Sequence, residues 1–144
     1  RLAFNPAFRH LFSTGVEIEG ECFAFESDFQ LSNGDLNAWG LTITPSYWVV
    51  PERLRLVGRY HFAGTDQAGG LVGGLGTGSD PFFDTSPTFV GDQFNSFYLG
   101  ANLHLYRDRV VILNGLEYAN MEDTKGLGFD TDAWIWHSAA RVSF

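Results

Sequence analysis

The sequence predicts an all-β protein whose antiparallel strands run up and down. Apolar and polar side chains alternate with a period of two in segment after segment, as in strands with two different faces. Helical signals are nearly absent, because no long segment places apolar residues at three-four spacing between a cap and a stop. The 144 residues, 44% hydrophobic and 16% aromatic, are enough for one folded domain.

The N-terminal part predicts two strands. Residues 1–12 alternate loosely and would form an additional strand, although Pro6 removes a hydrogen-bond donor from the ladder. The segment from Val16 to Ala24 alternates regularly. Its polar face carries Glu17, Glu19 and Glu21.

Two strands follow at residues 36–49 and 53–63. In the second, Leu54, Leu56 and Tyr60 share an apolar face. The opposite face of this strand carries Arg53, Arg55, Val57, Arg59 and His61.

Three strands are predicted at residues 97–106, 110–118 and 134–144. In the middle one, Asn114 and Glu117 fall on opposite faces, so a β-bulge and a mixed surface both remain open. In the last one, Trp134 and Trp136 share one face, and the other face carries His137 and Arg141.

The connections alternate in length. Residues 50–52 and 107–109 predict tight turns, whereas 27–35, 64–93 and 120–130 predict longer connections rich in Gly, Asp, Asn, Ser or Thr. If the strands run up and down, every tight turn lies at the same end as Phe144. This layout is typical of a bacterial outer-membrane barrel, whose strands are apolar outside and polar within.

A soluble β-sandwich is the competing fold, because it also uses alternating strands. The predicted strand lengths favour the barrel, since ~9–11 tilted residues cross a bilayer and soluble strands average ~5–6. Aromatic residues also gather near the strand ends, as at membrane interfaces. These residues are Tyr47, Trp48, Tyr106, Trp134, Trp136 and Phe144.

Several segments resemble one family of outer-membrane proteins. They read N-A-W-G and P-S-Y-W within 37–48, P-E-R-L and L-V-G-R-Y within 51–60, Y-L-G-A-N-L-H-L-Y at 98–106, R-V-V-I-L and E-Y-A within 109–119, and A-R-V-S-F at 140–144. Together they resemble the phosphate-selective porin O and P family over residues 15–144.

The resemblance implies a barrel of about sixteen strands, commonly a trimer, in the bacterial outer membrane. Residues 1–144 would be the C-terminal portion of that single barrel domain and would supply about six or seven strands, with Phe144 as part of the assembly signal. A six-stranded sheet alone would leave its edge N–H and C=O groups without partners in lipid. We therefore expect this sequence to be a piece of a longer barrel, and the alternative is that other chains complete the barrel.

The resemblance also implies passive diffusion of small hydrophilic solutes, including anions such as phosphate, through a basic lumen. The candidate anion-facing residues are Arg53, Arg55, Arg59, His61, His137 and Arg141. The candidate acidic wall residues are Glu17, Glu19 and Glu21. A structural alternative is that these acids pair with the arginines, and the net charge of -8 makes mixed selectivity as plausible as anion preference.

The sequence contains no signal typical of nucleic-acid binding, metal binding or catalysis. Nine Lys and Arg against seventeen Asp and Glu argue against nucleic-acid binding. We expect no cofactor, no metal site and no catalytic residues, because His10, His61, His104 and His137 lack ligand spacing and no serine lies in a nucleophile elbow. Residues 64–93 predict a plain extracellular loop, with an inward-folded constriction or a calcium loop as alternatives.

The sequence therefore predicts an outer-membrane porin whose partners are lipid, small solutes and sister subunits. One alternative is a small eight-stranded outer-membrane barrel with a structural or adhesive role. The other is a soluble β-sandwich that binds carbohydrate.

Overall fold

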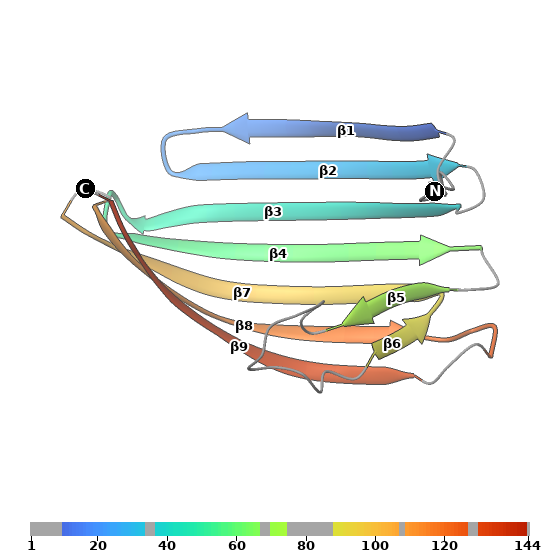
Figure 1. Ribbon diagram of the computed structural model, residues 1–144. Coiled ribbons are helices and arrows are strands. Elements are labelled where there is room, and N and C mark those ends of the chain that lie inside the picture. The colour runs from blue at the N-terminus through green and yellow to red at the C-terminus, as the bar shows by residue number, and fades with distance from the viewer. Residues whose placement is uncertain are drawn as a thin grey trace, which may run out of the picture.

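The computed structural model describes residues 10–33, 37–66, 70–74, 88–106, 109–126 and 130–143. Within them the chain is all-β, with one seven-stranded sheet and one two-stranded sheet (Figure 1). The strands are β1 (His10–Glu19), β2 (Phe23–Asn33), β3 (Ala38–Val50), β4 (Leu54–Thr65), β5 (Leu71–Gly74), β6 (Thr88–Gly91), β7 (Gln93–Leu105), β8 (Val110–Glu122) and β9 (Thr131–Val142).

The large sheet has the order β1-β2-β3-β4-β7-β8-β9, and every neighbouring pair is antiparallel. The short connections β1–β2, β3–β4 and β7–β8 lie at the same end as the end of β9 (Figure 1). The prediction of an all-β, up-and-down antiparallel sheet is thus confirmed. The sheet is open in the described part of the chain, because β1 and β9 form its two edges.

The N-terminal prediction needs correction. The regular alternation from Val16 to Ala24 is not one strand, because the chain turns at residues 20–22, where Gly20 N donates to Phe23 O at 2.7 Å. The predicted long connection 27–35 is also wrong, since β2 continues to Asn33. Residues 10–12 begin β1, and residues 1–9 lie outside the described part.

The other strand predictions differ mainly at their ends. β8 pairs without a register shift on both sides, so the mixed surface is correct and the bulge alternative is not. A register shift occurs instead between Trp48 and Val50 of β3. Within the predicted loop 64–93, the short strands β5 and β6 pair with each other, and residues 75–87 lie outside the described part.

Cross-strand pairing separates the large sheet into two faces. The apolar face carries Phe12, Val16 and Ile18 of β1; Phe23, Phe25, Phe29 and Leu31 of β2; Trp39, Leu41 and Ile43 of β3; Leu54, Leu56, Tyr60 and Phe62 of β4; Phe97, Leu99, Leu103 and Leu105 of β7; Val110, Ile112, Leu116 and Tyr118 of β8; and Trp134, Trp136, Ala140 and Val142 of β9. The polar face carries Glu17 and Glu19; Glu26, Asp28 and Gln30; Thr42, Thr44 and Ser46; Arg55, Arg59 and His61; Ser96, Tyr98 and Asn102; Glu117; and His137 and Arg141.

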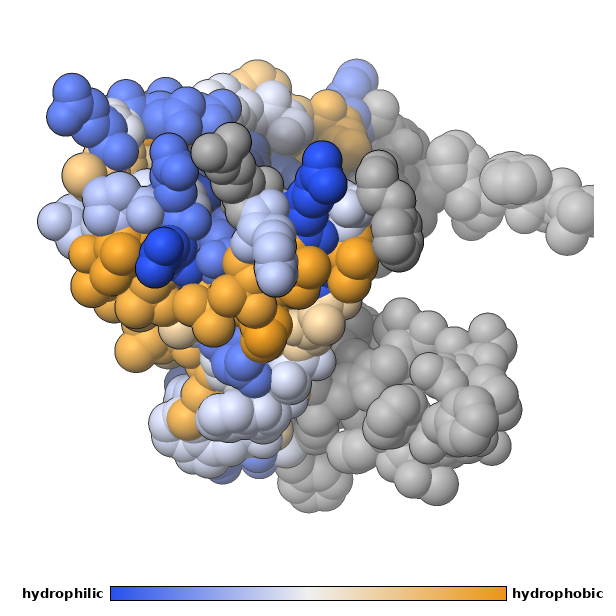
Figure 2. Space-filling model, turned by 90° about the vertical axis from the view of Figure 1, so that its left-hand side faces the viewer, coloured by the Kyte–Doolittle hydropathy of each residue, from blue (hydrophilic) through white to orange (hydrophobic). Residues whose placement is uncertain are grey.

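Exposed hydrophobic residues and buried polar residues lie on opposite faces of the large sheet. On the apolar face, Trp134 and Trp136 are 68% and 69% exposed, and every strand of the large sheet has at least one exposed large hydrophobic residue. On the polar face, Ser46, Ser96 and Glu117 are buried. Viewed from the end with the tight turns, hydrophobic residues gather in a band across the molecule (Figure 2). A soluble sheet normally buries its apolar face.

The β5–β6 hairpin lies on the polar side of the large sheet. Leu71 of β5 borders a hollow together with Gln30 and Ala63 of the polar face. A Cβ on Gly91 of β6 would lie only 2.7 Å from Cγ of Met121, which pairs with a polar-face position of β7. The described part of the 64–93 connection thus lies over the polar face of the large sheet.

Candidate functional site: the polar face

The structure places most predicted wall residues on the polar face. These are Arg55, Arg59, His61, His137, Arg141, Glu17 and Glu19. Arg53 and Glu21 instead lie in the turns before β4 and before β2. The alternation that predicted both residues on strand faces therefore extends one or two residues too far, into the turns.

A cluster centred on Glu117 joins the four strands β4, β7, β8 and β9. Arg59 Nη2 donates to Glu117 Oε2 at 3.1 Å, and His137 Nε2 donates to the same oxygen at 2.8 Å. The hydroxyl of Ser96, which is completely buried, donates to the other carboxylate oxygen. Arg59 therefore pairs with a carboxylate, as the structural alternative expected, but the partner is Glu117 and not Glu17, Glu19 or Glu21.

Tyr98 forms the base of this cluster. Its ring lies 5.0 Å from the Arg59 guanidinium carbon and 5.7 Å from the His137 ring. The ring occupies space beside two glycines, because a Cβ on either Gly100 or Gly115 would overlap it. The absence of side chains at these two positions thus allows Tyr98 to lie along the sheet, next to Arg59 and His137.

Arg55 has a different environment. Its Nε and Nη2 donate to Ser46 Oγ at 3.1 and 2.7 Å, and its guanidinium carbon lies 5.5 Å from the centre of the Trp48 ring. These partners are uncharged, and no described carboxylate pairs with Arg55. Of the two arginines on β4, Arg55 therefore keeps an uncompensated positive charge, whereas Arg59 does not.

The acidic residues gather on the first two strands. Glu17 of β1 is directly opposite Glu26 of β2, and Asp28 lies two residues further along β2. Like charges in directly opposite positions repel each other. The polar face is therefore acidic on β1–β2 and carries Arg55 and Arg59 on β4, so its charge changes sign from one side to the other.

Asp92 connects three strands at the end of the sheet that carries the longer connections. Its backbone N donates to Glu122 O at 2.9 Å, and its backbone O accepts from Thr65 N at 3.0 Å. Its buried carboxylate accepts hydrogen bonds from the hydroxyl and the backbone N–H of Thr124. These bonds lower the pKa of Asp92 below its ordinary value, and Lys125 adds to the effect.

Four aromatic residues form one row on the apolar face. Tyr60, Phe97, Tyr118 and Trp134 are successive partners across β4, β7, β8 and β9. Ring centres lie 4.6 Å apart in the Tyr60–Phe97 pair and 5.0 Å apart in the Tyr118–Trp134 pair. The next row towards the longer connections contains Phe62, Asn95, Asn120 and Asp132, and the next row towards the tight turns contains Gly58, Leu99, Leu116 and Trp136. On β7, β8 and β9 the aromatic row thus marks a boundary between polar and apolar surface.

Sequence reasoning missed several of these residues. Glu117 appeared only as an ambiguous position of its strand, and Ser96 and Tyr98 were not candidates. Their partners are distant in sequence, since Arg59 and Glu117 are 58 residues apart. One usable signal was the pair Gly100 and Gly115 within otherwise regular strands, because an interior glycine often marks a close approach.

The described residues contain no group of three or more metal-ligating side chains, and Cys22 is a free thiol. The described part of the chain also contains no apolar helix of membrane-spanning length. No protein-family model, curated protein or solved structure matches the chain significantly.

Proposed function

We propose that this chain forms part of the wall of a transmembrane β-barrel in the bacterial outer membrane, through which small hydrophilic solutes diffuse. The observation that carries the proposal is an apolar face with exposed large hydrophobic residues on every strand, combined with buried polar residues such as Ser46, Ser96 and Glu117 on the opposite face. In a soluble sandwich the apolar face would pack against a second sheet. The described second sheet, β5–β6, lies on the polar side instead. Lipid is the environment that suits such an apolar surface.

The height of the apolar surface supports a membrane location. Tyr118 in the aromatic row lies eight positions along β8 from Val110 at the turn end. At ~3.4 Å per residue this distance is about 27 Å along the strand, or about 21 Å in height for a tilt of ~40°. Outer-membrane barrels have an apolar band ~25 Å tall between aromatic girdles. The row Tyr60, Phe97, Tyr118 and Trp134 would form the girdle on the loop side.

The open edges require further strands under this proposal. β1 and β9 would otherwise expose unpaired N–H and C=O groups to lipid, where each costs several kcal/mol. Consistent with the resemblance to the phosphate-selective porin O and P family, we propose that additional strands of a longer barrel pair with both edges. The same resemblance suggests a homotrimer.

We propose a passive channel of mixed charge, in which Arg55 is the main attraction for anions. The Arg55 charge has no described carboxylate partner, whereas Glu117 neutralises Arg59. The acidic residues of β1 and β2 lie on the same polar face and would attract cations to that part of the wall. Phosphate remains one candidate solute, since a guanidinium fork suits phosphate oxygens.

The direct test is reconstitution. The protein purified from membranes should need detergent to stay in solution and should form stable conducting pores in planar lipid bilayers. A monomer that remains soluble without detergent and gives no conductance would overturn the proposal and would favour the sandwich.

A matched pair of variants tests the role of Arg55. A monovalent ion that passes ~6 Å from the Arg55 charge in water changes in energy by about 0.7 kcal/mol. Screening by 0.1 M salt reduces this change to about 0.4 kcal/mol. Because the effect has opposite signs for anions and cations, Arg55→Gln should lower the anion-to-cation permeability ratio by about threefold to fourfold. Arg59→Gln should also expose the charge of Glu117, so its loss of anion preference should be at least as large. An unchanged reversal potential for Arg55→Gln would refute the role of Arg55.

A further inference from the structure

The polar face contains a hollow that the Glu117 cluster does not use. It lies along β2, β3 and β4 and has a volume of about 390 Å³. This volume falls within the ~300–1,000 Å³ range of small-molecule sites. Its floor contains Gly40 and Ala63, which are directly opposite each other on β3 and β4. Gln30 and Phe94 flank them in the same row of the sheet.

The hollow exists because two small residues lie between two large ones. A Cβ on Gly40 would have its nearest described heavy atom, Phe62 O, at 3.4 Å, and no described side chain would lie within 4 Å of it. A second hollow of about 250 Å³ shares Gln30, Gly40 and Ala63 and is bordered by Leu71 of the inward-lying β5. The two hollows therefore adjoin each other on the polar face, and together we call them the recess.

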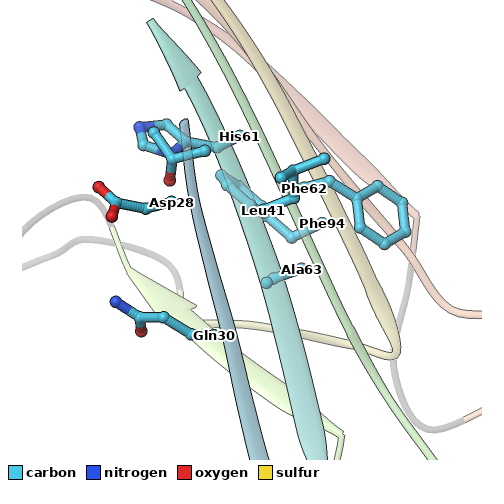
Figure 3. A pocket seen from close by; sticks show the side chains of 9 residues that line it. Asp28, Gln30, Leu41, His61, Phe62, Ala63 and Phe94 are labelled. Carbon is cyan, nitrogen blue, oxygen red and sulfur yellow. The ribbon is translucent and has the colours of Figure 1, made fainter. Parts of the chain in front are cut away.

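Three different hydrogen-bonding groups border the recess. Asp28, Gln30 and His61 project on the same side of the sheet (Figure 3). Thr42 Oγ1 lies 2.8 Å from His61 Nδ1, which orients the imidazole and leaves Nε2 for another partner. The carboxylate of Asp28 lies against Gly15 of β1, where a side chain would displace it. The recess thus offers a carboxylate acceptor, an amide and an oriented imidazole.

We propose that this recess binds a neutral solute rich in hydroxyl groups, of the size of a monosaccharide. A carboxylate and an amide can each bond two neighbouring hydroxyls, and Phe94 supplies apolar surface for the C–H face of a sugar ring. An inorganic anion fits poorly, because Asp28 would repel it and no described arginine or lysine borders the main hollow. The proposal deepens the proposed function, on which it rests, because it names a solute class for the channel wall.

The test is a binding titration that does not depend on conductance. D-glucose is added to the detergent-solubilised protein, and binding is followed by saturation-transfer NMR of the sugar protons. We expect saturable binding in the wild type and no binding in Gly40→Leu, whose side chain fills the recess. Asp28→Asn, which preserves the volume, should weaken binding about tenfold. Thr44→Ser, a polar-face change outside the recess, serves as the control and should bind as the wild type does.

The outcomes separate the two proposals. Glucose that fails to bind, or that binds equally to the wild type and Asp28→Asn, overturns the recess as a sugar site, even if Gly40→Leu misfolds. Displacement of glucose by inorganic phosphate, or binding of methylamine in its place, overturns the assigned solute class. If the protein conducts ions but does not bind glucose, the channel proposal stands and the proposed sugar site is refuted. If the protein does not conduct ions but binds glucose in a way that depends on Asp28, the sugar site stands and the channel proposal is refuted.

Discussion

Replacement of Glu117 by alanine tests the polar face most directly, because this one carboxylate connects β4, β7, β8 and β9. The change removes the ion pair with Arg59 at 3.1 Å, the contact with His137 at 2.8 Å and the hydrogen bond from Ser96. It also leaves the Ser96 hydroxyl buried without its acceptor. The expected result is a large loss of stability from a residue that lies on the hydrophilic face.

The contacts of Glu117 set the size of the loss. A hydrogen bond to a charged group contributes about 1.5–3 kcal/mol, and the buried Ser96 bond belongs to this class. The Arg59 and His137 side chains are 36% and 45% exposed, so solvent reduces each pairing to about 0.5–1 kcal/mol. We therefore expect Glu117→Ala to cost about 2.5–5 kcal/mol. Glu117→Gln, which still accepts from Ser96, should cost about 1–2 kcal/mol.

The assay is reversible urea unfolding of the protein in lipid vesicles, followed by tryptophan fluorescence. Glu26→Gln is the matched control, because Glu26 lies on the same face opposite Glu17, and removal of its charge relieves repulsion. A double-mutant cycle of Glu117→Gln with Arg59→Met should give a coupling energy of about 0.5–1 kcal/mol. A loss below 1 kcal/mol for Glu117→Ala, or a loss equal to that of the control, would refute the reasoning.

The remaining predictions concern the packing of Tyr98 and the acidity of Asp92. Gly115→Ala should lower the free energy of unfolding by about 1–3 kcal/mol, because the new methyl group overlaps the Tyr98 ring, and Tyr98→Leu should restore much of the loss. Gly20→Ala is the control, since its methyl group would meet only Phe23 O at 3.6 Å, and an equal loss there would argue against a specific clash. The lowered pKa of Asp92 means that its contribution to stability is present above the ordinary pKa and disappears as the pH falls through the lowered value. Hydrogen exchange at the Thr124 amide should therefore accelerate in that acidic range. Asp92→Asn should abolish this change of exchange rate with pH. If the change persists in the variant, another titratable group causes it.

Alternation predicts the middle and C-terminal strands well, because the end of each strand at a tight turn has a clear signal. At their other ends β7, β8 and β9 continue beyond the predicted bounds, to Gln93, Glu122 and Thr131. Between β3 and β4, Pro51 interrupts the ladder, and the period of two resumes at Leu54. The two faces of β4 follow directly from this period. The register across strands then brings Arg55, Arg59 and His61 to one face, as their spacing predicts.

Alternation fails at the N-terminus for a physical reason. Ile18, Gly20, Cys22 and Ala24 keep a period of two through the chain reversal, so the turn has no sequence signal of its own. The Glu117 cluster could not be predicted for a different reason. Its members come from four strands, and only the pairing register decides which side chains meet. A one-residue slip would have placed Glu117 on the opposite face.

The strand order has a consequence for assembly. Every hydrogen-bonded pair in the large sheet joins strands that follow each other in the chain, except β4 and β7, which enclose residues 66–92. The sheet can therefore grow by successive hairpins, and only one step has to close a long segment. The entropic cost of closing a loop rises by only ~0.6 kcal/mol for each doubling of its length. Insertions or deletions between residues 75 and 87 should thus change the speed of that one step and leave the rest of the growth sequence unaffected.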